Sequence, residues 1–428
     1  MAESNSRYTP LIDSARRVLE ANRLAGTSDW EGKKYDFVCP SAEVYPFQWL
    51  WDSAFHAVCL LHVDPTLAKQ EIRCLLQGAQ PDGFMPHMLL WDTAGREEQL
   101  ARCDIVRLDP HFTVTTQPPV LARAVERIYQ ATKDKDFVRE VLPPILAFFD
   151  WLAEHRDPDG DGLLAILQPD ESGLDASPKF DLPLGMSGRA SLVAPELHAA
   201  MQRLFDCYEP DRTDQEAMFR LDAFQVEEVL FNCIYGDGLR CLSRLVRDVL
   251  EDPAQAAALE RRAVNVTKGL MLKCWDQEAG LFWDLWTHDE RPVRILTVAS
   301  IFPLILDDLD PNIARRLLKE HLLDPAEFWT RYPVPTVAVD EPSFDPSFRS
   351  QAVFRGPTWI NTNWYLYWGL VQQGYKDIAS ELANRTFELM LRAGQHEFYN
   401  PLTGEGLGAA NLSWSSLVLD MLWGEGQL

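Results

Sequence analysis

The chain has 428 residues, 46% of them apolar, and carries 64 acidic side chains against 40 lysines and arginines. The apolar content suffices for a large core, and the net charge of −24 argues against nucleic acids and anionic membranes as partners. The cysteines form no CxxC pair and the N-terminal sequence lacks a signal peptide, so we expect a soluble, cytoplasmic protein with reduced thiols.

Helical periodicity dominates the chain. Apolar residues recur at steps of three and four in segments 11–25, 65–77, 118–132, 136–155, 192–207, 224–250, 254–275, 310–322, 357–373, 375–394 and 412–423. A further helix is expected just after Trp51, capped by Asp52 or Ser53. Strand-like patterns are short, with one small β element expected around 280–300. No linker interrupts the pattern, so we predict a single all-α domain over residues 1–428.

Three similar turns point to a closed helical array. DPDGDGLL begins at Asp157, DQEAGLFW at Asp276 and NPLTGEGL at Asn400. The spacing of about 120 residues accommodates about four helices with their loops, so three such units would give about twelve helices in two concentric rings of six. Chance recurrence of Asp-containing turns is the alternative interpretation.

Aromatic and polar residues gather in five segments next to predicted helix ends. The segments are 45–56 with 80–92, 113–121, 168–181, 354–370 and 394–416. Flat apolar rings beside fixed polar groups are typical of sites that hold sugars or aromatic ligands, although buried core tryptophans would give a similar pattern.

The third and fifth segments carry candidate acid–base carboxylates. The acidic residues in these two segments include Asp170, Glu171, Asp175, Asp181, Glu397 and Glu405. Glu397 lies between His396 and two aromatic residues, which is a better setting for a base than the glycines around Glu405. One carboxylate from each segment would supply the acid and base of glycoside hydrolysis; solvated acidic loops are the alternative.

Other chemistries have little support. The chain contains no GxSxG, no GxGxxG after a strand, no P-loop and no HExxH, and its histidines do not fall at metal-ligand spacings. We therefore expect neither a metal ion nor a nucleotide cofactor.

Taken together, the motifs resemble those of a known enzyme family. In chain order between Tyr45 and Trp414 they are YPFQWLWDSAF, PDGFMPH, ESGLDASP, RGPTWINTNW and EFYNPLTGEGLGAANLSWS. They are similar to the inverting α-glycosidases of glycoside hydrolase family 63, and most of all to its small hydrolases of mannosylglycerate and glucosylglycerate. The resemblance implies an (α/α)6 barrel with long loops at one mouth.

The resemblance also implies roles for individual residues. Asp175 matches the general acid and Glu397 the general base. Residues that match the sugar subsite and the pocket wall are Tyr45, Trp49, Trp51, Asp52, His87, Gln117, Trp359 and Trp364. Arg220, in MFRLDAFQ, matches an arginine that grips the glycerate carboxylate. Ala176 follows the acid where related sequences commonly carry Asn, which leaves the exact specificity open.

We therefore predict an inverting α-glycosidase that needs no cofactor and releases D-glycerate from a small charged glucoside or mannoside. The alternatives are a trehalase-like or oligosaccharide α-glucosidase on the same barrel, and a non-catalytic sugar-binding protein. The sequence leaves open the choice between glucose and mannose and the oligomeric state, a homo-oligomer included.

Overall fold

The inner helices of the protein are apolar nearly all round, which fits them for complete burial. In the computed structural model, which describes residues 7–103, 107–186, 193–211 and 214–428, six helical segments contact one another in sequence and close a ring. They are α2 (Leu50–Leu61), α5 (Leu121–Thr132), α9 (Val229–Leu245), the 3₁₀ helix η6 (Val298–Ile305), α12 (Ile360–Gln372) and the 3₁₀ helix η8 (Ser413–Leu417), which runs into α14 (Val418–Gly424). Every side chain of α2 is buried.

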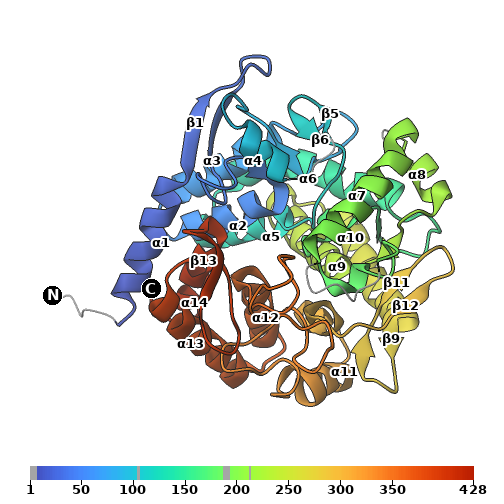
Figure 1. Cartoon of the computed structure of the whole chain (residues 1–428). Coiled ribbons are helices and arrows are strands. Elements are labelled where there is room, and N and C mark those ends of the chain that lie inside the picture. Colours follow the sequence, from blue (N-terminus) through green and yellow to red (C-terminus); the bar gives the residue numbers. More distant parts are fainter. Residues whose placement is uncertain (1–6, 104–106, 187–192, 212–213) are drawn as a thin grey trace.

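A second ring of amphipathic helices surrounds the first. It consists of α1 (Thr9–Ala21), α3 (Pro65–Leu76), α6 (Lys135–His155), α10 (Pro253–Gly269), α11 (Pro311–Arg316) and α13 (Lys376–Ala393). The helix α1, for example, buries Leu11, Ala15, Val18 and Leu19, which lie on one face. Inner and outer helices alternate along the chain, so the colours of Figure 1 run round the ring from blue to red. The fold is an (α/α)6 barrel.

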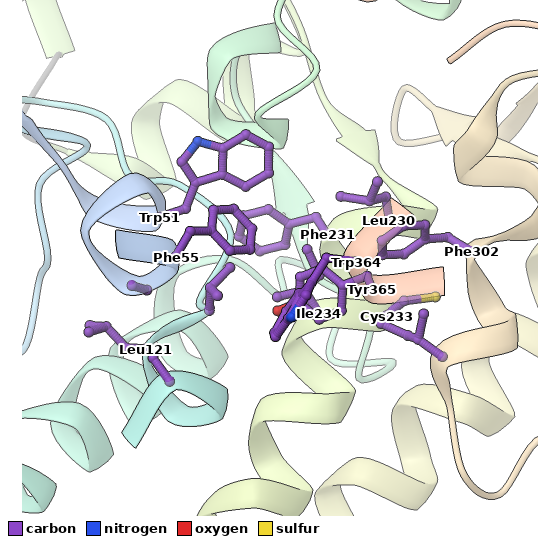
Figure 2. Packing of buried hydrophobic residues seen from close by; sticks show 14 of the residues in the cluster. Trp51, Phe55, Leu121, Leu230, Phe231, Cys233, Ile234, Phe302, Trp364 and Tyr365 are labelled. Carbon is purple, nitrogen blue, oxygen red and sulfur yellow. The ribbon is translucent and has the colours of Figure 1, made fainter. Parts of the chain in front are cut away.

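Side chains from the inner helices fill the middle of the ring (Figure 2). Phe55 of α2 packs edge-on against Trp364 and Tyr365 of α12, and Tyr365 packs in turn against Phe302 of η6. The core is therefore shared by elements that lie far apart in the sequence, and no part of the ring can bury its apolar face alone.

Short antiparallel strands lie where the inner helices begin. β3 (Gln48–Trp49) leads directly into α2, and β8 (Val226–Glu227) leads into α9. The sheet orders are β3-β4-β6-β5, β12-β11-β8-β7, β13-β14, β1-β2 and β10-β9. In the first sheet Gln48 pairs with Leu89 and Trp49 with Met88. The strands β3 and β8 therefore fix the direction in which α2 and α9 enter the barrel.

The remaining elements complete these sheets and cover the loops. The other strands are β1 (Arg23–Thr27), β2 (Lys34–Val38), β4 (Met88–Leu89), β5 (Arg107–Asp109), β6 (Phe112–Thr113), β7 (Ala165–Ile166), β9 (Trp275–Asp276), β10 (Leu281–Phe282), β11 (Asp284–Trp286), β12 (Arg291–Val293), β13 (His396–Tyr399) and β14 (Gly406–Ala410). Among the described residues, three α-helices lie outside both rings: α4 (Glu97–Arg102), α7 (Ala194–Tyr208) and α8 (Gln215–Leu221). No helix within the described ranges has the length and apolar content needed to cross a bilayer.

Several element boundaries differ from the prediction. The helix predicted over 11–25 ends at Ala21, because residues 23–27 form a hairpin strand with Lys34–Val38. The helix predicted over 224–250 begins at Val229, after the strand β8, and its last turn is π-helical. Residue 192, the predicted start of the fifth helix, lies outside the described residues. The β element expected around 280–300 is confirmed by β10, β11 and β12.

The twelve-helix arrangement is confirmed, but the three-unit repeat behind it is wrong. The turns at Asp157, Asp276 and Asn400 follow the outer helices α6, α10 and α13. One inner and outer pair separates the first two turns, whereas two pairs separate the second and third. What the turns share is local chemistry, since each side chain accepts hydrogen bonds from backbone N–H groups two or more residues ahead.

Candidate active site

A cavity of about 410 Å³ lies where the inner helices begin. It is lined by Pro40, Tyr45, Trp49, Trp51, Asp52, His87, Cys103, Gln117, Asp170, Gly173, Asp175, Ala194, Leu197, His198, Met201, Gln351, Val353, Phe354, Trp359, Glu397, Leu412 and Trp414. All five segments that the sequence singled out contribute to this lining, as does the outlying helix α7; the other lining residues are Pro40, Cys103, Gln351 and Val353. The fold thus brings together residues that are more than three hundred positions apart, such as Tyr45 and Glu397.

Most of the predicted site residues line this cavity. They are Tyr45, Trp49, Trp51, Asp52, His87, Gln117, Asp175, Trp359 and Glu397. Two predicted residues do not line it. Arg220 is exposed on α8 and pairs with Glu216 one turn away. Trp364 is buried inside the barrel, where its indole N–H donates to Asp420. Trp364 is therefore a residue of the barrel core. Arg220 is a surface residue.

At the start of α2, backbone N–H groups donate to acceptors on two other loops, and no side chain of the helix itself caps them. Trp49 occupies the N-cap position without a side-chain hydrogen bond, so the predicted capping by Asp52 or Ser53 is wrong. The N–H of Leu50 donates to the carbonyl of His87 at 2.9 Å, and the N–H of Trp51 donates to Oε1 of Gln117 at 3.2 Å. Three separate loops are thereby joined at one helix start. Asp52, inside the first turn, lines the cavity.

The acid candidate lies in a loop without regular strands. Asp175 follows the 3₁₀ turn Pro169–Ser172 and precedes a second, Pro178–Phe180. Between them Gly173 has φ +71, and a Cβ at this position would lie 2.3 Å from the Trp51 ring. The glycine therefore allows the backbone before Asp175 to approach the aromatic wall closely.

The base candidate is held by a hairpin. Glu397 lies on β13, and its Oε2 accepts the N–H of Ala409 from β14 at 2.8 Å. Its Oε1 lies 3.4 Å from the hydroxyl of Tyr45, which donates to it. Both donors favour the ionised carboxylate. Glu397 is therefore fixed in position in the cavity wall, with both carboxylate oxygens hydrogen-bonded.

Burial shifts the pKa values of several ionisable side chains in the cavity lining, among them Asp175, Glu397, Asp52 and His87. It raises the pKa of Asp175 to about 7, and it raises the pKa of Glu397 to about 7 with a further contribution from the charge of Asp175. Burial and the charge of Asp175 raise the pKa of Asp52 well above its usual value. Burial lowers the pKa of His87 to about 3, so His87 is neutral at physiological pH. The cavity therefore contains carboxyl groups that exchange protons near neutrality.

Aromatic rings form the walls. Trp51 and Trp414 meet edge to face at 5.5 Å between centroids, and Trp414 meets Trp359 at 5.6 Å. Phe354 stacks on Trp359 at 4.0 Å. Rigid rings in such a box present flat apolar faces at fixed angles, which suits the C–H faces of a sugar ring.

Sequence reasoning missed part of the lining. Trp414 and Phe354 had a signal, because both lie inside motifs already identified. Leu197, His198 and Met201 had none, since α7 has the pattern of an ordinary amphipathic helix. Only the tertiary structure shows that one side of this helix contributes to the cavity.

Among the described residues, a group of acidic side chains outside the cavity also brings its oxygens together. Asp159, Asp161, Glu227 and Glu290 have oxygens within 4.8 Å of one another. The ammonium group of Lys273 pairs with three of these carboxylates. The chain itself thus supplies a positive charge to this cluster.

Comparison with known proteins agrees with this geometry. The model of the mannosylglycerate hydrolase MGH1-like glycoside hydrolase domain matches residues 45–415. A mannosylglycerate hydrolase of Thermus thermophilus is 34% identical, over 90% of this chain and 96% of that protein. The glucosylglycerate hydrolase of Mycolicibacterium hassiacum is 26% identical, over 89% of this chain and 92% of that protein.

Solved structures include a similar barrel. The crystal structure of a family 63 mannosylglycerate hydrolase from Thermus thermophilus in complex with Tris and D-glycerate superposes with a TM-score of 0.81. It is 30% identical and covers 97% of this chain and 100% of that one. From the family match over most of the chain, together with a buried carboxylate site at the barrel mouth, it follows that this chain is a glycoside hydrolase of the MGH1-like family.

Proposed function

We propose that the protein hydrolyses the α-glycosidic bond of a small glycoside of D-glycerate, with a mannosyl or glucosyl group, and inverts the anomeric configuration. The observation that carries the proposal is the pair of carboxyl groups, Asp175 and Glu397, in one aromatic cavity. A cavity of about 410 Å³ suits a small glycoside better than a polymer. Relatives named for both sugars match nearly the whole chain, so the choice of sugar is part of the test.

The two carboxyl groups differ in their surroundings, which assigns their roles. Glu397 accepts hydrogen bonds from Ala409 and Tyr45, and these stabilise its charged form. Burial raises the pKa of Asp175. Among the described residues, only the hydrogen bond from its own backbone N–H opposes this rise. A carboxyl group that burial keeps protonated can donate a proton, while its hydrogen-bonded neighbour accepts one. We assign Asp175 as the acid and Glu397 as the base.

The reaction then follows in one displacement. Asp175 protonates the glycosidic oxygen while the bond from this oxygen to the anomeric carbon breaks, and glycerate leaves as the alcohol. A water oxygen bonds to the anomeric carbon from the opposite face and gives up a proton to Glu397. Asp52, Gln117 and His87 lie around the same cavity and are placed to hydrogen-bond the sugar hydroxyls.

The test is a panel of small α-glycosides followed by proton NMR. The panel contains mannosylglycerate, glucosylglycerate and neutral disaccharides, trehalose included. We expect cleavage of a glycerate glycoside with the β-anomer of the sugar appearing first, before mutarotation. Cleavage of neutral disaccharides alone would contradict the glycerate assignment, and release of the α-anomer would contradict inversion.

Variants of the two carboxyl groups test whether the cavity is catalytic. Asp175→Asn and Glu397→Gln preserve size and should each lower kcat by about 10²-fold or more, since general acid and base catalysis contribute this much. Arg220→Ala is the matched surface control and should leave KM unchanged, because this side chain is exposed on α8 and does not line the cavity. Unchanged turnover in both carboxyl variants would show that neither Asp175 nor Glu397 acts as the acid or the base.

A further inference from the structure

The loop that carries Asp175, residues 169–181, is bounded by buried ion pairs. Glu171 stands four residues before Asp175, Lys179 four residues after it, and Asp181 two residues beyond Lys179. Each of these side chains pairs with a different part of the barrel. We call residues 169–181 the acid loop.

The first anchor joins the acid loop to the end of α6. Both oxygens of Glu171 accept from the guanidinium of Arg156, at 2.6 and 2.7 Å, and both residues are at most 2% exposed. The same carboxylate accepts the N–H of Thr116 at 3.1 Å and that of Leu167 at 2.8 Å. Since Thr116 precedes Gln117, one carboxylate fixes both the acid loop and a neighbouring residue of the cavity lining.

The second anchor joins the loop to the start of α9. The ammonium of Lys179 pairs with Glu228, the N-cap residue of α9, and with Asp284 of β11, the latter at 3.1 Å. Asp284 in turn accepts the N–H of Val229 at 2.7 Å. All three charged side chains are buried, so water cannot replace these contacts.

The third anchor joins the loop to the segment before α12. The guanidinium of Arg355 donates to both oxygens of Asp181. Arg355 is 3% exposed and follows Phe354, which stacks on Trp359 in the cavity wall. The end of the acid loop is thereby tied to the aromatic box.

Buried ion pairs contribute little net stability, because desolvation of the charges offsets their attraction. What they do supply is a fixed geometry. We infer that Glu171, Lys179 and Asp181, with their partners, are positioning residues that set the place of the Asp175 carboxyl group and thus control protonation of the leaving oxygen. This inference rests on the proposed role of Asp175 as the acid.

The inference makes a prediction about leaving groups. A displaced acid harms departure of an alkoxide such as glycerate, whereas fluoride leaves a glycosyl fluoride without a proton from Asp175. We therefore compare kcat/KM for the glycerate glycoside with kcat/KM for the fluoride of the same sugar. Glu171→Gln should lower the ratio of the two values by between about 10- and 100-fold, as expected for a displacement of about 1 Å.

The matched control is another buried ion pair. Glu126 of α5 is 2% exposed and pairs with Arg244 of α9, and neither residue lines the cavity. Glu126→Gln should destabilise the fold to a similar degree but leave the ratio unchanged. If Glu171→Gln does not fold, Asp181→Asn provides the same measurement, since Asp181 is less buried than Glu171.

The possible outcomes separate the inference from the proposed function. If Asp175→Asn lowers the ratio and Glu171→Gln lowers kcat/KM for both substrates equally, the anchors are merely structural and the inference is wrong. If Asp175→Asn itself leaves the ratio unchanged, Asp175 is not the acid and the proposed function fails with it. A lower ratio in both variants, accompanied by a shift of the alkaline limb of the pH profile in Glu171→Gln, supports the inference.

Discussion

Asp175 and Glu397 share a cavity and a raised pKa, yet they must hold opposite protonation states in the active enzyme. Activity should fall below neutral pH as Glu397 takes up a proton and above neutral pH as Asp175 loses one, because burial raises the pKa of each to about 7. The expected profile of kcat/KM is a bell centred near pH 7. An optimum at pH 4 to 5 would contradict this environment for the pair.

The Asp175→Asn variant should change the profile in a defined way. Measured with a glycosyl fluoride, the variant should remain active, because fluoride leaves without a proton from Asp175, and the pH profile then reports the ionisation of Glu397. Its acid limb should move to lower pH, because the charge of Asp175 contributes to the raised pKa of Glu397. The wild-type enzyme with the same fluoride is the control, and an acid limb that stays in place would show that the two groups do not interact.

Gly408, on β14, lies against the carboxylate of Glu397. A Cβ on Gly408 would lie 2.5 Å from Oε2 of Glu397, and the residue has φ +67. Gly408→Ala should displace the base and lower kcat by about 10- to 100-fold in a folded protein. Gly426 has the same φ with no atom within 4 Å, so Gly426→Ala carries equal backbone strain and should keep full activity. Equal losses in both variants would assign the effect to strain.

At this scale the sequence predicts residues whose chemistry is local. Asp175, Glu397 and Trp359 lie in motifs where carboxylates, glycines and aromatics are adjacent in the chain, and the structure gathers them in the cavity. Arg220 was matched through the family resemblance alone, in the less distinctive segment MFRLDAFQ, and in the structure its charge pairs with Glu216 at the surface. A charge by itself carries no information about the direction in which its helix faces.

Individual helices were predictable where one face is apolar. The outer helices alternate polar and apolar faces, and the predicted segments over 65–77 and 375–394 agree with α3 and α13 within a residue or two. The 3₁₀ helix η6 was not predicted, because VASIFPLI is apolar except for Ser300 and shows no helical or strand periodicity. Its inner position in the ring explains the composition.

Close packing between two inner segments provides an element-scale test. A Cβ on Gly369 of α12 would lie 2.8 Å from the carbonyl oxygen of Leu304 in η6. Gly369→Ala should therefore push two inner segments apart and lower the free energy of unfolding by about 1–3 kcal/mol, measured by urea denaturation. Gly374, just beyond the same helix, has φ +86 and no atom within 4 Å. Gly374→Ala should cost about 1–2 kcal/mol through strain alone, with no change in α12 packing.

At the scale of the whole molecule, one buried carboxylate joins several helices across the ring. Asp420 of α14 accepts from Trp364 and Trp368 of α12 at 2.8 Å, from His62 beyond α2 at 2.7 Å, and from Arg127 of α5. This network explains why Trp364 belongs to the core rather than the cavity. Asp420 therefore connects elements on which closure of the ring depends.

Removal of this charge should be costly. Asp420→Asn should lower the free energy of unfolding by about 3–5 kcal/mol, since it leaves a buried arginine without its partner.

The stability contributed by Asp420 should also depend on pH. Burial alone would raise the pKa of Asp420, but the charge of Arg127 and the contact with His62 hold this pKa below its usual value. Wild-type stability should therefore decline as the pH falls below the ordinary carboxyl value, and the variant should lack this part of the decline. Urea denaturation between about pH 5 and pH 3 measures both effects. Glu140→Gln, which breaks an exposed pair with Arg73, is the control and should have little effect.

The ring is closed by the meeting of segments from the two ends of the chain. The amide of Asn22 donates to the carbonyl of Asn411 at 2.8 Å, across a sequence separation of 389 residues, and Ser413 donates its N–H to the carbonyl of Pro40. During synthesis, the apolar faces of the early helices therefore remain exposed until the segment with Glu397 and Trp414 has been made. A chaperone that shields the growing chain would act in this interval, and truncated chains should aggregate rather than accumulate as partial enzymes.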